Sequence, residues 1–231
     1  DEVDRLIKDY QSKTGAPARK ALRAREDALR RHLSMVYQRF LDPNDTRARN
    51  VTIRLNGTGV EAWDPFQRGL SELVAEEVVP TELPDGTEAT FTVRAYILPR
   101  REEFPNDQLA QAAMLSNDRQ GIYIYRENRL IHDADWLGLY QKEPHLTLLR
   151  VEFSFDHKLD DAFHLDIKKS QIILNDVLAD WLHSQFLPAP RREANNRSRE
   201  GQQKKIAQQG QGAHDVSNNT IRNRQAAAGG V

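Results

Sequence analysis

Alternating apolar side chains in two separate segments restrict the fold of this chain more than any other feature. Residues 89–99 read ATFTVRAYILP and residues 146–155 read LTLLRVEFSF. A period of two places successive side chains on opposite faces of a strand, so each segment predicts a strand with one buried face. The two buried sets are Phe91, Val93, Ala95 and Ile97 in the first strand, and Leu149, Val151, Phe153 and Phe155 in the second.

Residues 121–136, GIYIYRENRLIHDADW, have the pattern of a β-hairpin. Aromatic and β-branched residues at Ile122–Tyr125 and Leu130–Ile131 flank the polar stretch Arg126–Arg129, which predicts a turn with a charged tip. A shorter hairpin is predicted at Asn56-Gly57, because this dipeptide favours positive backbone φ. The Gly-Thr-Gly at 57–59 lacks the lysine and the following helix of a phosphate-binding loop.

Two segments predict helices. Over residues 19–41 a stripe with spacings of three and four is apolar except at one glutamate; it consists of Leu22, Glu26, Leu29, Leu33, Val36 and Phe40. A second helix is capped by Asn175 or Asp176 and ends before Pro188. Strands and helices together predict an α+β fold, in which a mostly antiparallel sheet is packed by helices and preceded by a long helix.

The composition divides the chain into three parts. Residues 1–50 form the helical part, residues 51–188 the α+β domain, and residues 189–231 a flexible basic tail. Residues 189–224 hold eight Lys/Arg against three acidic residues and few large apolar ones. Such a segment buries too little surface to offset its ordering entropy, so disorder or a solvated helix is expected.

Composition also excludes several classes of protein. The net charge of −1 gives no global bias towards nucleic acid. No apolar run approaches the roughly 20 residues of a membrane span, and no signal peptide is visible. The absence of cysteine excludes disulfides and thiolate metal sites. A cytoplasmic protein without a membrane partner is therefore expected.

The sequence contains no self-sufficient active site. The motifs HExxH, GxSxG and Walker A are absent. His164 and Asp166 would share one face of a strand over FHLDIKKS, but nothing supplies a third metal ligand at fixed spacing. No metal site is predicted.

Lys169 is the one residue that departs from the pattern around it. The face that carries Phe163, Leu165 and Ile167 continues to this lysine, whereas Lys168 lies on the polar face. An ammonium group at the end of an apolar face must reach solvent or an anion. Snorkelling at a strand end and binding of an anionic ligand are both open explanations.

The segment 148–186, LLRVEFSFDHKLDDAFHLDIKKSQIILNDVLADWLHSQF, resembles the end of the transducer domain of GHKL-type ATPases, the group of gyrase, MutL and the MORC proteins. KSQI at 169–172 is similar to the Lys-polar-polar-aliphatic motif of MutL-like members. GIYIYRENRLI resembles a MORC hairpin, RRHLSMVYQRFL at 30–41 the last helix of the ATP-binding module, and WDPF at 63–66 the entry to the next domain. The resemblance covers roughly residues 30–187.

The resemblance implies a transducer domain with a ribosomal-protein-type fold. In such a domain Lys169 is the catalytic residue: it contacts the ATP γ-phosphate in the neighbouring site and couples hydrolysis to conformational change. The polar hairpin tip would lie near the interface with the nucleotide domain. The family's Glu-bearing helix with its Mg²⁺-binding Asn, its Asp-x-Gly-x-Gly loop and its Gly-rich lid are all absent from residues 1–231. ATP and Mg²⁺ are therefore expected to bind to an N-terminal ATP-binding domain of an intact parent, and the chain alone is expected to be inactive.

Two alternatives and two further partners stay open. The chain could be a non-catalytic nucleic-acid-binding module or a scaffold without an ATP-linked role. The candidate nucleic-acid contacts are Arg126, Arg129, Arg191, Arg192, Lys204 and Lys205. DNA and a second copy of the parent, forming a homodimer, are the further candidate partners.

Overall fold

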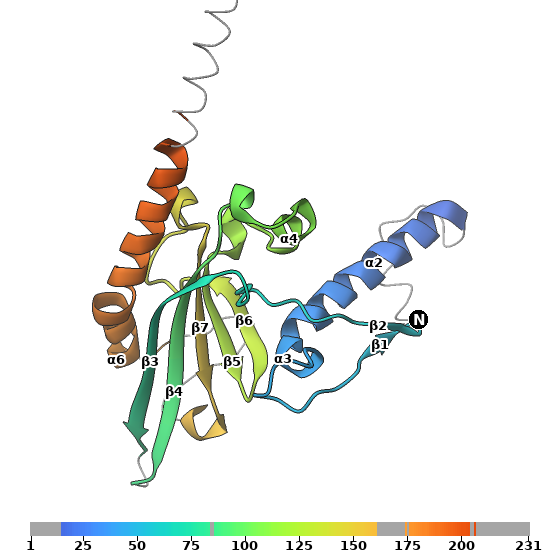
Figure 1. The fold of residues 1–231 in the computed structure, drawn as a ribbon. Coiled ribbons are helices and arrows are strands. Elements are labelled where there is room, and N and C mark those ends of the chain that lie inside the picture. The colour runs from blue at the N-terminus through green and yellow to red at the C-terminus, as the bar shows by residue number, and fades with distance from the viewer. Residues whose placement is uncertain (1–14, 84–85, 161–173, 175, 204–205, 207–231) are drawn as a thin grey trace, which may run out of the picture.

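A five-stranded sheet forms the centre of the molecule, and chain segments pack on both of its faces (Figure 1). The computed structural model describes residues 15–83, 86–160, 174, 176–203 and 206. The strand order is β3 (Glu72–Glu82), β4 (Glu88–Ile97), β7 (Leu149–Phe155), β5 (Gly121–Arg126) and β6 (Arg129–Asp135). Neighbouring strands are antiparallel except β5 and β7, which are parallel. The fold is α+β, as the sequence predicts.

The helices are α2 (Gly15–Val36), α3 (Gln38–Leu41), α4 (Asp107–Ala112) and α6 (Asp176–Trp181), the last continuing into a π-helical turn, Leu182–Phe186. Short 3-10 turns lie at Arg101–Glu103, Asn117–Arg119, Pro144–Leu146 and His157–Leu159. In Figure 1, α2 projects away from the sheet, whereas α6 and the helix over residues 188–203 lie against it.

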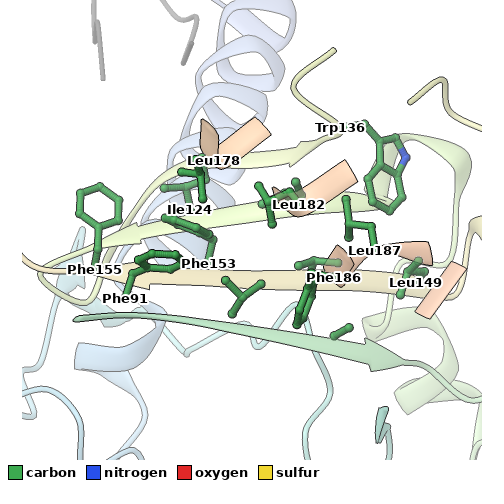
Figure 2. Packing of buried hydrophobic residues seen from close by; sticks show 14 of the residues in the cluster. Phe91, Ile124, Trp136, Leu149, Phe153, Phe155, Leu178, Leu182, Phe186 and Leu187 are labelled. Atoms are coloured by element: carbon green, nitrogen blue, oxygen red, sulfur yellow. The ribbon is translucent and has the colours of Figure 1, made fainter. Parts of the chain in front are cut away.

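The first face of the sheet carries the main hydrophobic core (Figure 2). Both alternating sets predicted from the sequence lie in this core, so that prediction is confirmed. Phe91 stacks on Phe153 with ring centroids 5.2 Å apart, and Trp181 meets Phe91 edge-on at 5.8 Å. The covering side chains come from α6, from the π-helical turn and from the helix that follows; they are Leu178, Leu182, Phe186, Leu187 and Ala194.

The second face of the sheet is covered by the segment between α2 and β3. Phe66 is fully buried and packs against Tyr96, Tyr123 and Tyr125, with ring centroids 5.1, 5.5 and 6.2 Å away. Met35 of α2 packs against the same cluster. Because aromatic rings bury a large area each, this layer fixes the N-terminal segment on the sheet.

Local predictions from the sequence agree with the structure in part. Asn56 and Gly57 have φ of 50° and 80° and join β1 (Arg54–Leu55) to β2 (Thr58–Gly59), which confirms the short hairpin. The helix predicted over 19–41 begins at Gly15 and is interrupted at Tyr37, whose φ of −105° and ψ of 20° leave the helical region. Strand β3 was not predicted.

The structure extends the packed region past the boundary predicted at residue 188. Residues 188–203 are helical, and Ala194 is fully buried in the main core. The Arg191 guanidinium lies 3.5 Å from the centre of the Tyr140 ring and pairs with Glu143 at 3.2 Å. Residues 189–203 of the predicted tail are helical, which is one of the two expected states, but the helix is packed on the core through Ala194 instead of being fully solvated. A small residue at position 194 lets this polar helix approach the core closely.

Gly121 begins the hairpin strand in a conformation that disfavours other residues. Its φ is +119°, and an added Cβ would lie 2.8 Å from the backbone N and C of Asp135. We expect Gly121→Ala to lower the free energy of unfolding by at least about 2 kcal/mol, because backbone strain and a backbone clash combine. Urea denaturation measures the effect.

Gly69→Ala is the matched control, since an added Cβ there meets nothing within 4 Å and no positive φ is required. We expect its urea midpoint to stay near that of wild type. Equal urea midpoints for Gly121→Ala and Gly69→Ala would show that position 121 tolerates a side chain.

Candidate functional site

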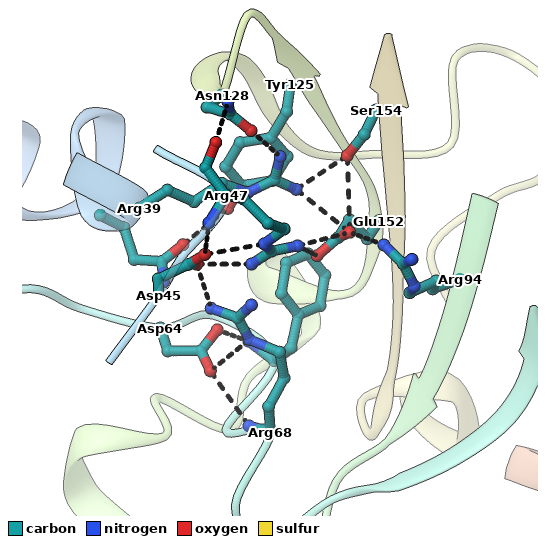
Figure 3. A network of polar contacts seen from close by, with 12 residues as sticks. Arg39, Asp45, Arg47, Asp64, Arg68, Arg94, Tyr125, Asn128, Glu152 and Ser154 are labelled. Carbon is teal, nitrogen blue, oxygen red and sulfur yellow. Dashed lines mark hydrogen bonds and ion pairs between the residues drawn. The ribbon is translucent and has the colours of Figure 1, made fainter. Parts of the chain in front are cut away.

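A network of ion pairs joins the N-terminal segment to the second face of the sheet (Figure 3). At its centre is Glu152 of β7, which is fully buried. Its Oε1 lies 3.1 Å from guanidinium nitrogens of Arg39 and Arg47 and 2.9 Å from that of Arg94. Burial alone would raise the pKa of Glu152, but the three arginines hold this pKa below its usual value. Glu152 is therefore an ionised carboxylate inside the fold.

Arg39 connects α3 to the tip of the predicted hairpin. Its side chain is only 2% exposed, and its guanidinium lies 3.7 Å from the centre of the Tyr125 ring. It donates hydrogen bonds to Oδ1 of Asn128 at 3.0 Å and to Oγ of Ser154 at 2.7 Å. Asn128 in turn donates from Nδ2 to the Arg47 carbonyl at 2.8 Å. The helix end, the hairpin tip and β7 are thus joined through one buried guanidinium.

The network continues outward through two aspartates and Arg68. Asp45 accepts from Arg47 at 2.6 Å and from Arg68 at 3.2 Å, and Arg68 donates from Nε to Asp64 at 3.0 Å. Burial raises the pKa of Asp64 to about 6, against the opposing backbone hydrogen bond from Phe66. Part of this network therefore begins to lose charge in mildly acidic solution.

A second buried arginine lies on the same face without a carboxylate contact among the described residues. Arg150 is fully buried and donates to the carbonyl oxygens of Ala113 at 2.7 Å, Met114 at 3.2 Å and Pro65. Two of these carbonyls follow α4, where a cation is favoured by the helix dipole. Arg150 fixes the loops around the site rather than facing a ligand.

Among the residues that the sequence proposes as contacts, Arg126 and Arg129 line one cavity, whereas Arg191 and Arg192 lie on the C-terminal helix. Lys169, His164, Asp166, Lys204 and Lys205 lie outside the described residues. Arg126 is engaged by Asp160 through two hydrogen bonds of 2.7 and 2.5 Å. Arg191 is held by Tyr140 and Glu143, whereas Arg129 and Arg192 are exposed.

A cleft lies between α2 and the β5–β6 hairpin. Its larger cavity, of about 490 Å³, is lined by His32, Leu33, Met35, Val36, Tyr37, Arg126, Arg129, Leu130, Ile131, His132, Asp133 and Asp160. A smaller cavity of about 290 Å³ shares His32 and Met35 with it and adds Ala28, Arg31, Ser34, Trp63, Met114 and Arg119. We call these two cavities the α2 cleft. Arg129 lines it without a hydrogen-bond or ion-pair partner among the described side chains. The residue pattern of α2 and of the hairpin does not by itself indicate which of their side chains line this cleft.

Metal binding and membrane insertion find no support in the described part of the chain. No group of three or more His, Cys, Asp or Glu side chains there is placed to hold a metal ion. None of the described helices combines the length and the apolar character that crossing a bilayer requires. The expectation that His164 and Asp166 do not form a metal site stays a prediction.

Comparison with known proteins finds no matching family model, no matching curated protein and no matching solved structure. The function is therefore inferred from the geometry of the site and from the motifs of the sequence.

Proposed function

We propose that this chain is the transducer portion of a GHKL-type ATPase and that it acts together with an ATP-binding domain. The observation that carries the proposal is the ionic connection from α3 through Arg39 and Glu152 to the hairpin tip and β7. A transducer must pass a movement from one domain to another, which requires contacts that hold separate elements together. The buried network provides such a connection between the helix end and the sheet.

The exposed face of α2 supports docking of a second domain. Leu22 is 48% exposed and Leu29 is 46% exposed, although Leu33 and Val36 of the same stripe face the α2 cleft. An apolar helix face of this kind marks an interaction surface. In the proposed assembly the ATP-binding domain covers Leu22 and Leu29, and the network transmits its movement to the sheet.

ATP and Mg²⁺ would be held by that partner domain. The Gly-Thr-Gly stretch at 57–59 forms a hairpin turn and strand instead of a loop before a helix, so it offers no phosphate cradle. The contribution of this chain to chemistry is Lys169, whose ammonium would contact the γ-phosphate and stabilise its developing charge. Strand β7 leads through His157–Leu159 towards the segment that carries this lysine.

The chain by itself is expected to release no phosphate from ATP. The measurement is steady-state phosphate release with and without Mg²⁺, and the Lys169→Ala chain is the control for contaminating ATPases. Phosphate release by the wild-type chain but not by this variant would contradict the proposal. A second test is the natural coding sequence upstream of residue 1. The proposal requires the Glu/Asn helix, the Asp-x-Gly-x-Gly loop and the Gly-rich lid there or in a separate partner chain.

A further inference from the structure

Helix α2 concentrates positive charge in a chain whose net charge is −1. It carries six Lys/Arg against two acidic residues. Only Arg30 is half-buried: it pairs with Glu26 at 3.3 Å and donates to the Gly59 carbonyl at 2.8 Å. The other five are exposed; they are Arg19, Lys20, Arg23, Arg25 and Arg31. This local charge is available to an anionic partner.

The α2 cleft adds cations next to this helix. Its two acidic groups are already engaged, because Asp160 pairs with Arg126 at 2.5 Å and Asp133 pairs with Arg119 at 3.2 Å. Arg31 and Arg129 are the exposed arginines that line the cleft. Since both of these carboxylates are paired, the unpaired charged side chains among the described residues that line the cleft are cationic.

Each cavity of the cleft also contains an aromatic side chain. Tyr37 lines the larger cavity and Trp63 lines the smaller one. Arg119 lies over the Trp63 ring at 5.5 Å, and Tyr37 meets Phe40 edge-on at 6.2 Å. Aromatic side chains beside a basic groove are the combination that binds unpaired bases together with their phosphates.

We propose that α2 and its cleft bind single-stranded nucleic acid. Phosphates follow the basic face through Lys20, Arg23 and Arg31 to Arg129, and bases enter the cavities at Tyr37 and Trp63. Unpaired bases are required because a duplex keeps its base faces stacked internally. The inference does not depend on the proposed ATP-linked role.

Leu22 and Leu29 are not among the residues that line the α2 cleft. Arg31 follows Leu22 by nine residues, which at 100° per residue places the two on opposite sides of the helix. Phosphates along Lys20 and Arg31 therefore lie on the side of α2 away from Leu22, whereas the larger cavity lies below the apolar stripe, at Leu33 and Val36. The proposed nucleic-acid interface lies on α2 and not on the basic tail that the sequence predicts. Arg191 of that tail is less available to a phosphate, because it is already engaged by Tyr140 and Glu143.

The test measures binding of the full chain to a fluorescently labelled 20-nucleotide oligo(dT) by anisotropy at low salt. The double variant Arg31→Glu/Arg129→Glu is compared with Arg192→Glu/Arg199→Glu, whose two arginines are exposed on the C-terminal helix. Both doubles change the net charge equally, so a difference between them reports the location of binding. We expect at least about a tenfold loss of affinity for the cleft variant and less than about threefold for the control, because direct phosphate contacts outweigh general charge.

The salt dependence of the affinity and the removal of a stacking side chain test the inference in two further ways. Four phosphate contacts predict a slope of log affinity against log salt of about −3 for a single strand, and the cleft variant should reduce its magnitude by about half. Tyr37→Ala should weaken binding with an unchanged slope, since it removes stacking without removing charge. Circular dichroism and melting temperature establish that each variant is folded.

Several outcomes would overturn the inference. A larger loss for the Arg192/Arg199 variant would place binding on the C-terminal helix, and equal losses would indicate general electrostatics. Equal affinity for duplex DNA and for oligo(dT) would show that base stacking does not contribute to binding. Binding to phosphatidylserine vesicles without binding to the oligonucleotide would make α2 a membrane-surface helix. Absence of binding by wild type at low salt would end the inference and leave the phosphate-release test unaffected.

Discussion

Glu152→Ala is expected to lower the free energy of unfolding by about 3–5 kcal/mol, the usual cost of removing one partner from a buried ion pair. Glu152 is fully buried, and Arg39 beside it is 2% exposed. The substitution leaves the Arg39 guanidinium inside the fold without its carboxylate. Small domains have total stabilities of about 5–15 kcal/mol, so the loss is a large part of the whole. Urea denaturation at pH 7, followed by circular dichroism, measures it.

Glu76→Ala is the matched control for this change. Glu76 pairs with Arg94 at 2.7 Å, so it belongs to the same network, but its side chain is 41% exposed. A pair at the surface contributes at most about 1 kcal/mol, and the control should lose no more than this. Similar losses for both variants would show that burial of Glu152 does not determine stability. If Glu152→Ala fails to fold, Glu152→Gln keeps the side-chain shape and should still melt well below the Glu76 variant.

The same strand shows what the sequence could and could not predict. Alternation in β7 correctly assigns Val151 and Phe153 to the main core, because a period of two fixes which side chains share a face. It also assigns Arg150 and Glu152 to a polar face, and both are fully buried in the structure. A one-strand pattern cannot reveal that a distant segment, here residues 38–71, will cover that second face.

Strand β3 and the packing of the helix over residues 188–203 were not predicted, because their sequences show little of the hydrophobic pattern expected of a packed element. Strand β3 carries Glu72, Glu76, Glu77 and Glu82 at the edge of the sheet, so it lacks the strong alternation of an inner strand. The helix over 188–203 is polar and includes Pro190, and its packing depends on Ala194 and Gly201. Small residues that permit close approach are not recognisable as core residues by hydrophobicity.

The sequence indicates some single residues of the candidate site, but it does not indicate which of them lie together. The sequence singled out Arg126 and Arg129 at the hairpin tip, and the structure places both at the α2 cleft. It did not indicate Arg39, Arg47 or Glu152, because their partners lie far away along the chain: Arg39 and Ser154 are 115 residues apart. Long-range pairing of this kind is a property of the fold.

In the proposed assembly of this chain with an ATP-binding domain, Lys169→Ala is expected to lower ATP turnover by roughly 10²-fold or more, which is the cost of losing one preorganised charge stabiliser. Lys169 lies outside the described residues, so this expectation follows from the sequence motif and from the proposed function. In the proposed role the ammonium group would act on charge that develops on the γ-phosphate, so kcat should fall more than the affinity for ATP.

Lys168→Ala is the control, since the adjacent lysine is predicted to lie on the polar face of the same strand. It carries the same charge and should alter turnover by less than about threefold, because a side chain on that face would point away from the transferred group. ATP binding and melting temperature are measured for both variants, so that a loss of turnover is distinguished from unfolding. Equal turnover of wild type and Lys169→Ala would remove the lysine from the mechanism. Equal losses in the two variants would show that general charge near the nucleotide, rather than one positioned ammonium, supports hydrolysis.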